Sequence, residues 1–150
     1  MDLILWRHAD AEDGAPGRPD AERSLTPKGE KQARRMAAWL EKRLPQDMRV
    51  LASPARRAQQ TAQALTRRFE TRREIGTEAD ARSILKAAGW PDGEGAVVVV
   101  GHQPTLGQVA ALALTGKAAD WSIKKGAAWW IESRGEGEVI THAVIEPDLV

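Results

Sequence analysis

Short, wholly apolar runs recur along the chain between longer stretches of mixed polarity. Residues 3–6 and residues 96–100, the second with four consecutive valines, are typical of strands buried on both faces of a sheet. Residues 48–52, which are apolar except for Arg49, predict a further strand, and a weaker signal predicts a short strand over residues 72–75. These runs predict a sheet whose central strands are covered on both sides.

Longer segments between the apolar runs predict helices. The four predicted helices are residues 26–44, 53–69, 78–88 and 104–115. Thr26 suits the cap of the first helix and Pro27 suits its first turn. Ser53 and Pro54 repeat this start signal, so we expect the second helix to begin there.

The order of the elements predicts the fold class. Strands and helices alternate along the chain until two strands, residues 127–133 and 138–145, follow each other around a Gly135-Glu136-Gly137 turn as a hairpin. This order predicts an α/β fold, a three-layer αβα sandwich whose central sheet is mostly parallel with an antiparallel edge. A length of 150 residues and a hydrophobic fraction of 42% lead us to expect a single domain over residues 1–150.

Composition narrows the possible functions. The formal net charge of +1 argues against a protein that binds nucleic acid through bulk charge. The chain has no cysteine, which excludes disulfides, thiolate metal sites and cysteine nucleophiles. It shows neither a signal peptide nor an apolar segment long enough for a membrane span, so we expect a cytoplasmic protein with no membrane partner.

Two histidines follow the two most apolar runs. Arg7-His8 comes after the first run, and Gly101-His102 comes after the run of valines. Ligands of such sheets bind outside the carboxyl ends of the strands, where we expect these residues and Ser53 to meet. Imidazole is a nucleophile near neutral pH, and the planar fork of an arginine suits a phosphate group. Either histidine alone would be read as structural, but together they predict phosphoryl chemistry.

The surroundings of His102 favour an anion. Gly101 is expected to let the backbone approach a ligand closely, and the following helix offers unpaired amides at its start. Arg56 and Arg57 lie one turn into the second predicted helix, where their spacing alone is weak evidence. Because they are expected to lie beside two other strand ends, they are nevertheless candidates for the anion site.

Four stretches of the sequence resemble the histidine phosphatase superfamily, also called phosphoglycerate-mutase-like. Residues 5–9 (Leu-Trp-Arg-His-Ala) are similar to its Arg-His-Gly/Ala signature. Residues 53–62 and residues 100–102 are similar to its second and third motifs, and residues 25–33 are similar to the stretch that follows the first. Within the superfamily, the SixA-like branch is the most similar to this chain. The resemblance lies in residues 101–107, in residues 124–130 and in the small size of the chain.

This resemblance implies a role for each motif residue. His8 would accept the phosphoryl group and form a phosphohistidine enzyme, which water then hydrolyses. Arg7, Arg57 and His102 would form the phosphate pocket, with Arg57 preferred to Arg56 because it precedes Ala58 in the motif. The resemblance implies no metal and no cofactor, since guanidinium and imidazole groups supply the positive charge.

A general acid is harder to assign. Many members of the superfamily place a carboxyl group after the third strand, where this chain has Glu74, Glu78 and Asp80. Glu78 and Asp80 are more readily explained as groups that cap a helix or favour its dipole. SixA-like proteins are described as lacking the usual acid, and a phosphohistidine depends less on one because its leaving nitrogen can be protonated beforehand.

The leading interpretation is a phosphatase that acts on phosphohistidine in a signalling protein. One alternative is a phosphatase of a small phosphorylated metabolite. Another alternative is a non-catalytic phosphoprotein-binding module. The presence of both histidines and both motif arginines argues against it. His142 lies in the last predicted strand with no glycine or arginine beside it, so we expect it to be structural. The oligomeric state stays open.

Overall fold

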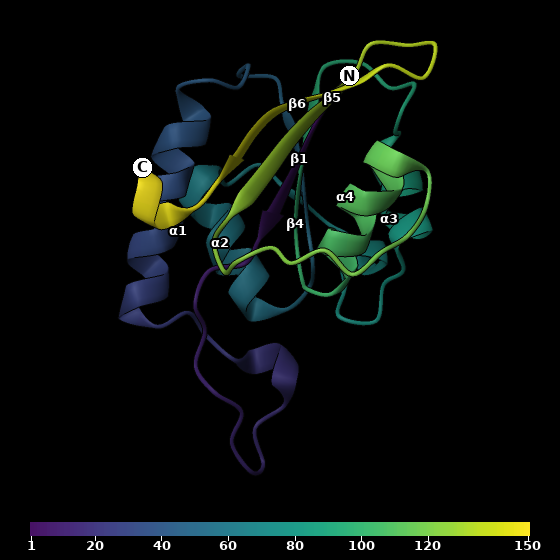
Figure 1. The fold of residues 1–150 in the computed structure, drawn as a ribbon. Helices are drawn as coiled ribbons and strands as arrows, with labels where there is room; N and C mark the ends of the chain where they lie inside the picture. Colours follow the sequence, from purple (N-terminus) through teal and green to yellow (C-terminus); the bar gives the residue numbers. More distant parts are fainter.

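A computed structural model describes residues 1–150, in which one six-stranded sheet lies between two layers of helices (Figure 1). The strands are β1 (Asp2–Arg7), β2 (Arg49–Ala52), β3 (Glu70–Thr71), β4 (Ala96–Gly101), β5 (Ala128–Ser133) and β6 (Val139–Ile145). The helices are α1 (Pro27–Glu41), α2 (Arg56–Leu65), α3 (Ala81–Ala88) and α4 (Thr105–Thr115). The order of strands and helices along the chain is the one predicted from the sequence.

The sheet has the strand order β3-β2-β4-β1-β5-β6. Strand β4 pairs in parallel with both β1 and β2, and β2 pairs in parallel with β3. Strand β5 runs antiparallel to β1 and to β6, and the strands β5 and β6 form the antiparallel edge of the sheet. The predicted fold class, a three-layer αβα sandwich with a mostly parallel sheet and an antiparallel edge, is therefore confirmed.

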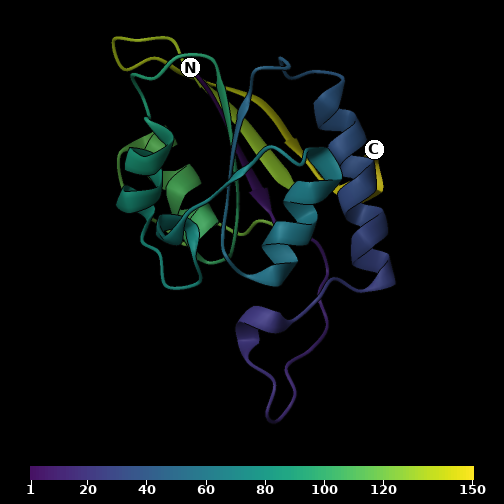
Figure 2. The same cartoon turned by 180° about the vertical axis from the view of Figure 1, so that it is seen from behind.

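Alternate residues of the central strands build two separate cores. In β1, Leu3 and Leu5 join the core beneath α3 and α4, whereas Ile4 and Trp6 join the core beneath α1 and α2. Figure 2 shows the two helix layers from behind, with the sheet between them. Because both faces are covered, the central strands are apolar throughout, as the sequence indicated. Each fully buried aliphatic side chain stabilises the fold by about 1.5–3 kcal/mol.

The start of α1 is as predicted, and the start of α2 is not. The Thr26 hydroxyl accepts a hydrogen bond from Gly29 N at 3.0 Å, and Pro27 is the first residue of α1. Helix α2 begins at Arg56, three residues after the predicted Ser53. The Ser53 hydroxyl is buried against a histidine and accepts from Ala55 N, but residues 54 and 55 are not helical, so Ser53 lies ahead of the helix rather than at its cap.

The segment between α2 and α3 also corrects the prediction. Strand β3 is Glu70–Thr71, and the expected strand over residues 72–75 is instead a 3-10 turn, Arg73–Ile75, that buries Ile75 in the core. Helix α3 begins at Ala81 rather than at residue 78, because the Asp80 carboxylate accepts from Ser83 N at 3.0 Å and caps it.

The connection between β1 and α1 extends beyond the body of the molecule, at the lower end of Figures 1 and 2. It contains a short 3-10 turn, Asp20–Glu22. Its base is closed by a hydrogen bond from Glu12 N to Ser24 O at 2.8 Å. None of the helices has the length and apolar character that crossing a bilayer requires.

Candidate active site

The site lies where the neighbouring parallel strands β1 and β4 end. Arg7 and Gly101 are partners in the ladder, so the next residues, His8 and His102, leave the sheet side by side. His8 N donates to Gly101 O at 3.0 Å, and the two imidazole rings are 5.2 Å apart between centroids. Both histidines are buried, His8 with 7% and His102 with 5% of its surface exposed.

The His8 ring is held so that one nitrogen is free. Its Nδ1 lies 2.8 Å from the carbonyl oxygen of Ala9, which can only accept, so Nδ1 carries the proton and Nε2 keeps a lone pair. The pKa of His8 is lowered to about 4, chiefly by burial and then by the nearby Arg57 and Arg7 guanidiniums, while the hydrogen bond to Ala9 acts in the opposite direction. His8 is therefore neutral, as a nucleophile must be, at neutral pH.

His102 is fixed by a serine. Its Nε2 lies 2.7 Å from the Ser53 hydroxyl oxygen, and this oxygen accepts from Ala55 N at 3.1 Å, so its own proton is free to be donated to Nε2. A hydroxyl that donates to Nε2 leaves the imidazole proton on Nδ1, and Nδ1 is buried with no partner in the protein. Burial and then the neighbouring His8 lower the pKa of His102 to about 3.

Two arginines complete the site. Arg7 donates from NH1 to Ile123 O at 2.8 Å. Arg57, only 3% exposed, donates from NH1 to the main-chain oxygen of Asp20 at 2.9 Å and from NH2 to its carboxylate at 3.1 Å. The Nε atoms of both arginines are buried without a partner. Unpartnered buried donors are rare and costly, so these nitrogens indicate a ligand with acceptor oxygens.

Thr61 connects the two halves of the site. Its buried hydroxyl donates to Arg57 O at 2.8 Å and accepts from Ala9 N at 3.1 Å. The carboxyl end of β1 and the first turn of α2 are therefore joined through one side chain. This link places the Arg57 side chain beside His8.

These groups surround a cavity of about 270 Å³. Its lining residues are Arg7, His8, Ala11, Asp20, Arg23, Arg57, Thr77, His102, Gln103 and Lys125. Four of them are basic, one is a carboxylate and only Ala11 is apolar. A cavity of this charge and composition is suited to a small anion with several oxygens.

The four residues named from the sequence, Arg7, His8, Arg57 and His102, all line this cavity. Arg56 is exposed and does not. We expected Gly101 to let the backbone approach a ligand, and this was wrong, because a side chain at this position would meet Ile75 and Leu106. Gly101 therefore serves packing beneath the site.

The carboxyl groups considered as general acids lie outside the cavity. Glu78 and Asp80 line a neighbouring groove, and Asp80 is engaged in capping α3. The carboxylate that does line the cavity is Asp20, which the sequence did not single out. Arg23 was missed with it, because the loop that carries both has no apolar periodicity to reveal how it folds.

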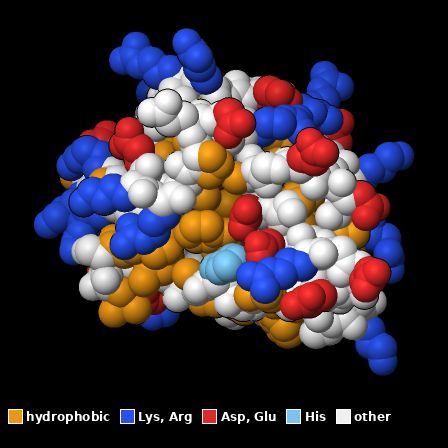
Figure 3. Space-filling view, turned by 90° about the horizontal axis from the view of Figure 1, so that it is seen from above, with side chains coloured by type: hydrophobic (Ala, Val, Ile, Leu, Met, Phe, Trp, Pro, Cys, Tyr) orange, Lys and Arg blue, Asp and Glu red, His pale blue; other side chains and the backbone are white.

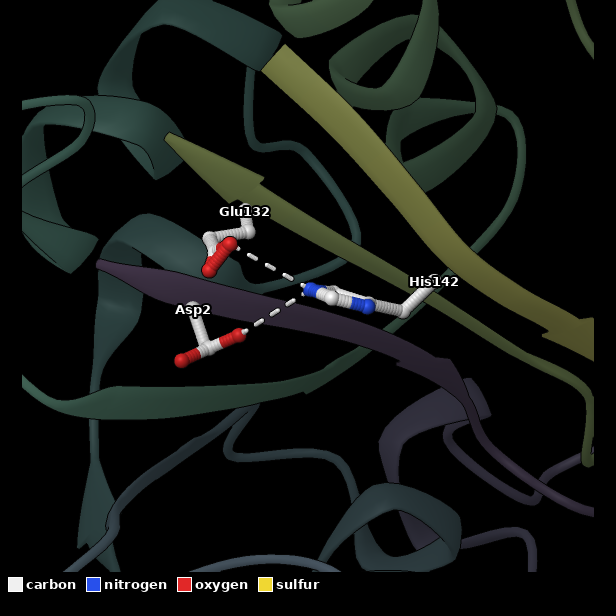
Figure 4. Close-up of side chains that lie close together, drawn as sticks. All are labelled: Asp2, Glu132 and His142. Carbon is white, nitrogen blue, oxygen red and sulfur yellow. Dashed lines mark ion pairs between the residues drawn. The ribbon is translucent and has the colours of Figure 1, made fainter. Parts of the chain in front are cut away.

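His142 lies at the other end of the sheet, among acidic groups. Its Nε2 is 3.4 Å from Glu132 and 4.0 Å from Asp2, on strands β5 and β1 (Figure 4). The same carboxylate oxygens also accept from Arg134 and Trp130, so their partners are protein groups. Figure 3 views this end of the molecule, where a histidine is exposed beside acidic side chains.

The sheet and the pair of strand-end histidines together define an α/β protein with the phosphoglycerate-mutase-like fold. A family model described as histidine phosphatase superfamily (branch 1) matches residues 3–84. The chain belongs to this superfamily. An uncharacterised protein of Picosynechococcus sp. is 33% identical over 124 residues, which cover 73% of this chain and 71% of that protein.

Solved structures agree with the family. The protein histidine phosphatase SixA, complexed with tungstate, is 26% identical, with a TM-score of 0.84 over 99% of this chain and 98% of its own. A phosphoserine phosphatase of Entamoeba histolytica, in complex with 3-phosphoglyceric acid, is 16% identical, with a TM-score of 0.70 and 95% of each chain covered. The second likeness shows the fold alone.

Proposed function

We propose that this protein is a phosphatase that works through a phosphohistidine at His8. The observation that carries the proposal is the set of three buried nitrogens without partners, Nε of Arg7, Nε of Arg57 and Nδ1 of His102, on residues that line one cavity with His8. A phosphoryl group offers three acceptor oxygens to such donors. The tungstate in the SixA structure, a phosphate-like oxyanion, supports the same assignment.

The reaction follows from the His8 geometry. Nε2, whose lone pair is free, attacks phosphorus while the bond between phosphorus and the leaving atom breaks. The Arg7 and Arg57 guanidiniums neutralise the charge that builds on the equatorial oxygens, and the neutral His102 ring donates a hydrogen bond to these oxygens from Nδ1. In the second step, a water oxygen attacks phosphorus and the P–Nε2 bond breaks, which yields inorganic phosphate and restores His8. These basic side chains provide the charge stabilisation that the chemistry needs, with no metal or cofactor required.

We further propose that the substrate is a phosphohistidine in a signalling protein. Asp20, the one carboxylate of the cavity, is paired with Arg57 and Arg23, whose hydrogen bonds outweigh partial burial and lower its pKa. An ionised carboxylate cannot protonate an alkoxide leaving group, whereas a phosphohistidine nitrogen can be protonated beforehand. The nearly complete absence of apolar lining also leaves little to hold the body of a small metabolite.

The experiment that tests the chemistry is trapping of the intermediate. The protein is incubated with a labelled phosphorylated histidine-containing protein and quenched, and the label is expected to be acid-labile, alkali-stable and located on His8. His8→Ala is expected to lose both label and turnover, while His142→Ala, a matched change at the far end of the sheet, keeps both. Label that persists in His8→Ala would refute the assignment.

The substrate class is tested with the same preparation. We expect turnover of the phosphohistidine protein to exceed that of simple phosphomonoesters by about a hundredfold, the contribution typical of a general acid that only the esters need. Faster cleavage of phosphomonoesters would instead favour the small phosphorylated molecule as substrate. No turnover of either, with tungstate still bound, would favour the phosphoprotein-binding module.

A further inference from the structure

The Asp20 carboxylate joins the two arginines on one side of the cavity. Its Oδ2 accepts from NH2 of Arg57 at 3.1 Å, and its Oδ1 accepts from Nε of Arg23 at 3.0 Å. Its main-chain oxygen accepts from NH1 of Arg57 at 2.9 Å. One residue of an exposed loop therefore engages both terminal nitrogens of a buried guanidinium.

This arrangement decides which edge of Arg57 is available. NH1 and NH2 each direct one of their two hydrogens at Asp20, so one N–H remains on each of them, and the Nε–H is buried with no partner in the protein. A guanidinium is planar, so two anchored nitrogens fix the direction of the third. The Asp20 side chain itself is 60% exposed, so its contact with Arg57 contributes little to the core.

Building on the proposed function, we propose that Asp20 is a positioning residue, which clamps Arg57 and Arg23 so that they present their free donors to the phosphoryl group. Asp20 carries a negative charge, and on Coulomb's law alone it would weaken the binding of an anion in this cavity. As a positioning residue, Asp20 would instead strengthen anion binding, because it holds Arg57 and Arg23 in place. The sign of its effect on anion binding therefore separates the two roles.

The test uses tungstate binding by calorimetry to three variants of the full chain. Asp20→Ala removes the clamp and the charge, and we expect tungstate to bind about tenfold more weakly, the effect of losing a charge-assisted hydrogen bond. Asp20→Asn removes the charge and the acceptor used by Arg23 but keeps one side-chain oxygen and the main-chain oxygen for Arg57, so we expect affinity close to that of the parent and well above that of Asp20→Ala. Glu12→Ala, which breaks an exposed ion pair with Arg18 in the same loop, is the matched control and should bind like the parent.

Turnover gives a second reading on the same variants. We expect kcat to fall about tenfold in Asp20→Ala and to be restored largely in Asp20→Asn, with melting temperatures close to the parent in both, because the changed side chain is exposed. A role confined to folding of the loop would move the melting temperature and spare kcat.

Three other outcomes would overturn the proposal. Tighter tungstate binding in both Asp20 variants would make Asp20 a competing internal anion, and equal binding in all variants would leave it no role. Loss of binding in Glu12→Ala as well would mean that the loop acts as a whole. A parent that binds no tungstate and forms no phosphohistidine would refute the proposed function itself, and this result is distinct from the other three.

Discussion

At the residue scale, the Ser53 hydroxyl fixes the ring of His102. It is completely buried and lies 2.7 Å from His102 Nε2, so by donating to Nε2 it keeps the proton of that ring on Nδ1. Removing it leaves the ring free to adopt the tautomer that cannot donate from Nδ1. One side chain outside the cavity lining thereby controls a donor inside it.

We therefore expect Ser53→Ala to lower kcat about tenfold, which corresponds to the roughly 1–1.5 kcal/mol of one hydrogen bond. Steady-state kinetics on a phosphohistidine protein measures the change, and the exposed Ser122→Ala serves as control. Parental kcat in Ser53→Ala would show that another group fixes the His102 ring.

The four motif residues could be predicted from the sequence, whereas Asp20 and the hydrogen bond between Ser53 and His102 could not. Arg7, His8 and His102 follow strands whose apolar runs are clear, so the carboxyl ends of a parallel sheet bring them together. Asp20 lies in a loop, where the conformation depends on contacts with Arg57 and Arg23 that no periodicity records. Ser53 was expected near His102 from the strand ends, but its hydrogen bond to a ring 49 positions further along the chain was not, because local signals indicated a helix cap.

At the element scale, helix α4 supports the site through the segment that follows it. Gly107 in α4 packs so closely on this segment that a Cβ atom would lie 1.7 Å from Trp121 O. The same carbonyl accepts from Gln103 Nε2 at 2.9 Å, and two residues further on Ile123 O accepts from Arg7. The glycine of the helix thus permits the anchoring of an arginine in β1.

Gly107→Ala is expected to lower the free energy of unfolding by about 1–3 kcal/mol or more, since the carbonyl is backbone and must move. Urea unfolding measures this change, and tungstate binding is expected to weaken with it because Arg7 loses its anchor. In Gly14→Ala no atom lies within 4 Å of the new Cβ, so this control should stay within about 0.5 kcal/mol of the parent. Equal stability of both variants would contradict the close packing.

Strands were better predicted than helix starts. Apolar runs report burial directly, and the central strands β1 and β4 are buried on both faces, so their positions agree within a residue or two. The prediction of a strand over residues 72–75 was wrong because Ile75 enters the core from a 3-10 turn. A single buried apolar residue in such a turn gives a sequence pattern like that of a short strand.

At the scale of the whole molecule, the two buried histidines make stability depend on pH. Their pKa values in the folded protein, about 4 for His8 and about 3 for His102, lie below the ordinary value of 6.5. The unfolded chain therefore binds more protons below pH 6.5, and acid favours unfolding. The stabilisation is complete above about pH 6.5, falls as pH approaches 4, and stops falling below the folded pKa values.

The expected slope is about 1.4 kcal/mol per pH unit for each histidine in this range. Urea unfolding between pH 7 and pH 4.5 measures it for the parent and for a variant with both His8→Gln and His102→Gln. The double variant is expected to lose less stability over the same interval. Identical slopes would mean that the two histidines are protonated alike in the folded and unfolded chains.

The order of the strands in the sheet determines how late in synthesis the site can form. Strands β1 and β2, which lead to His8 and to Arg57, form no ladder with each other, and both pair instead with β4. Since β4 begins at Ala96, nearly two thirds of the polypeptide precedes the element that joins these two strands. During synthesis the site is therefore a late product, and an incomplete chain holds His8, the proposed nucleophile, and Arg57 after strands that do not yet share a neighbour.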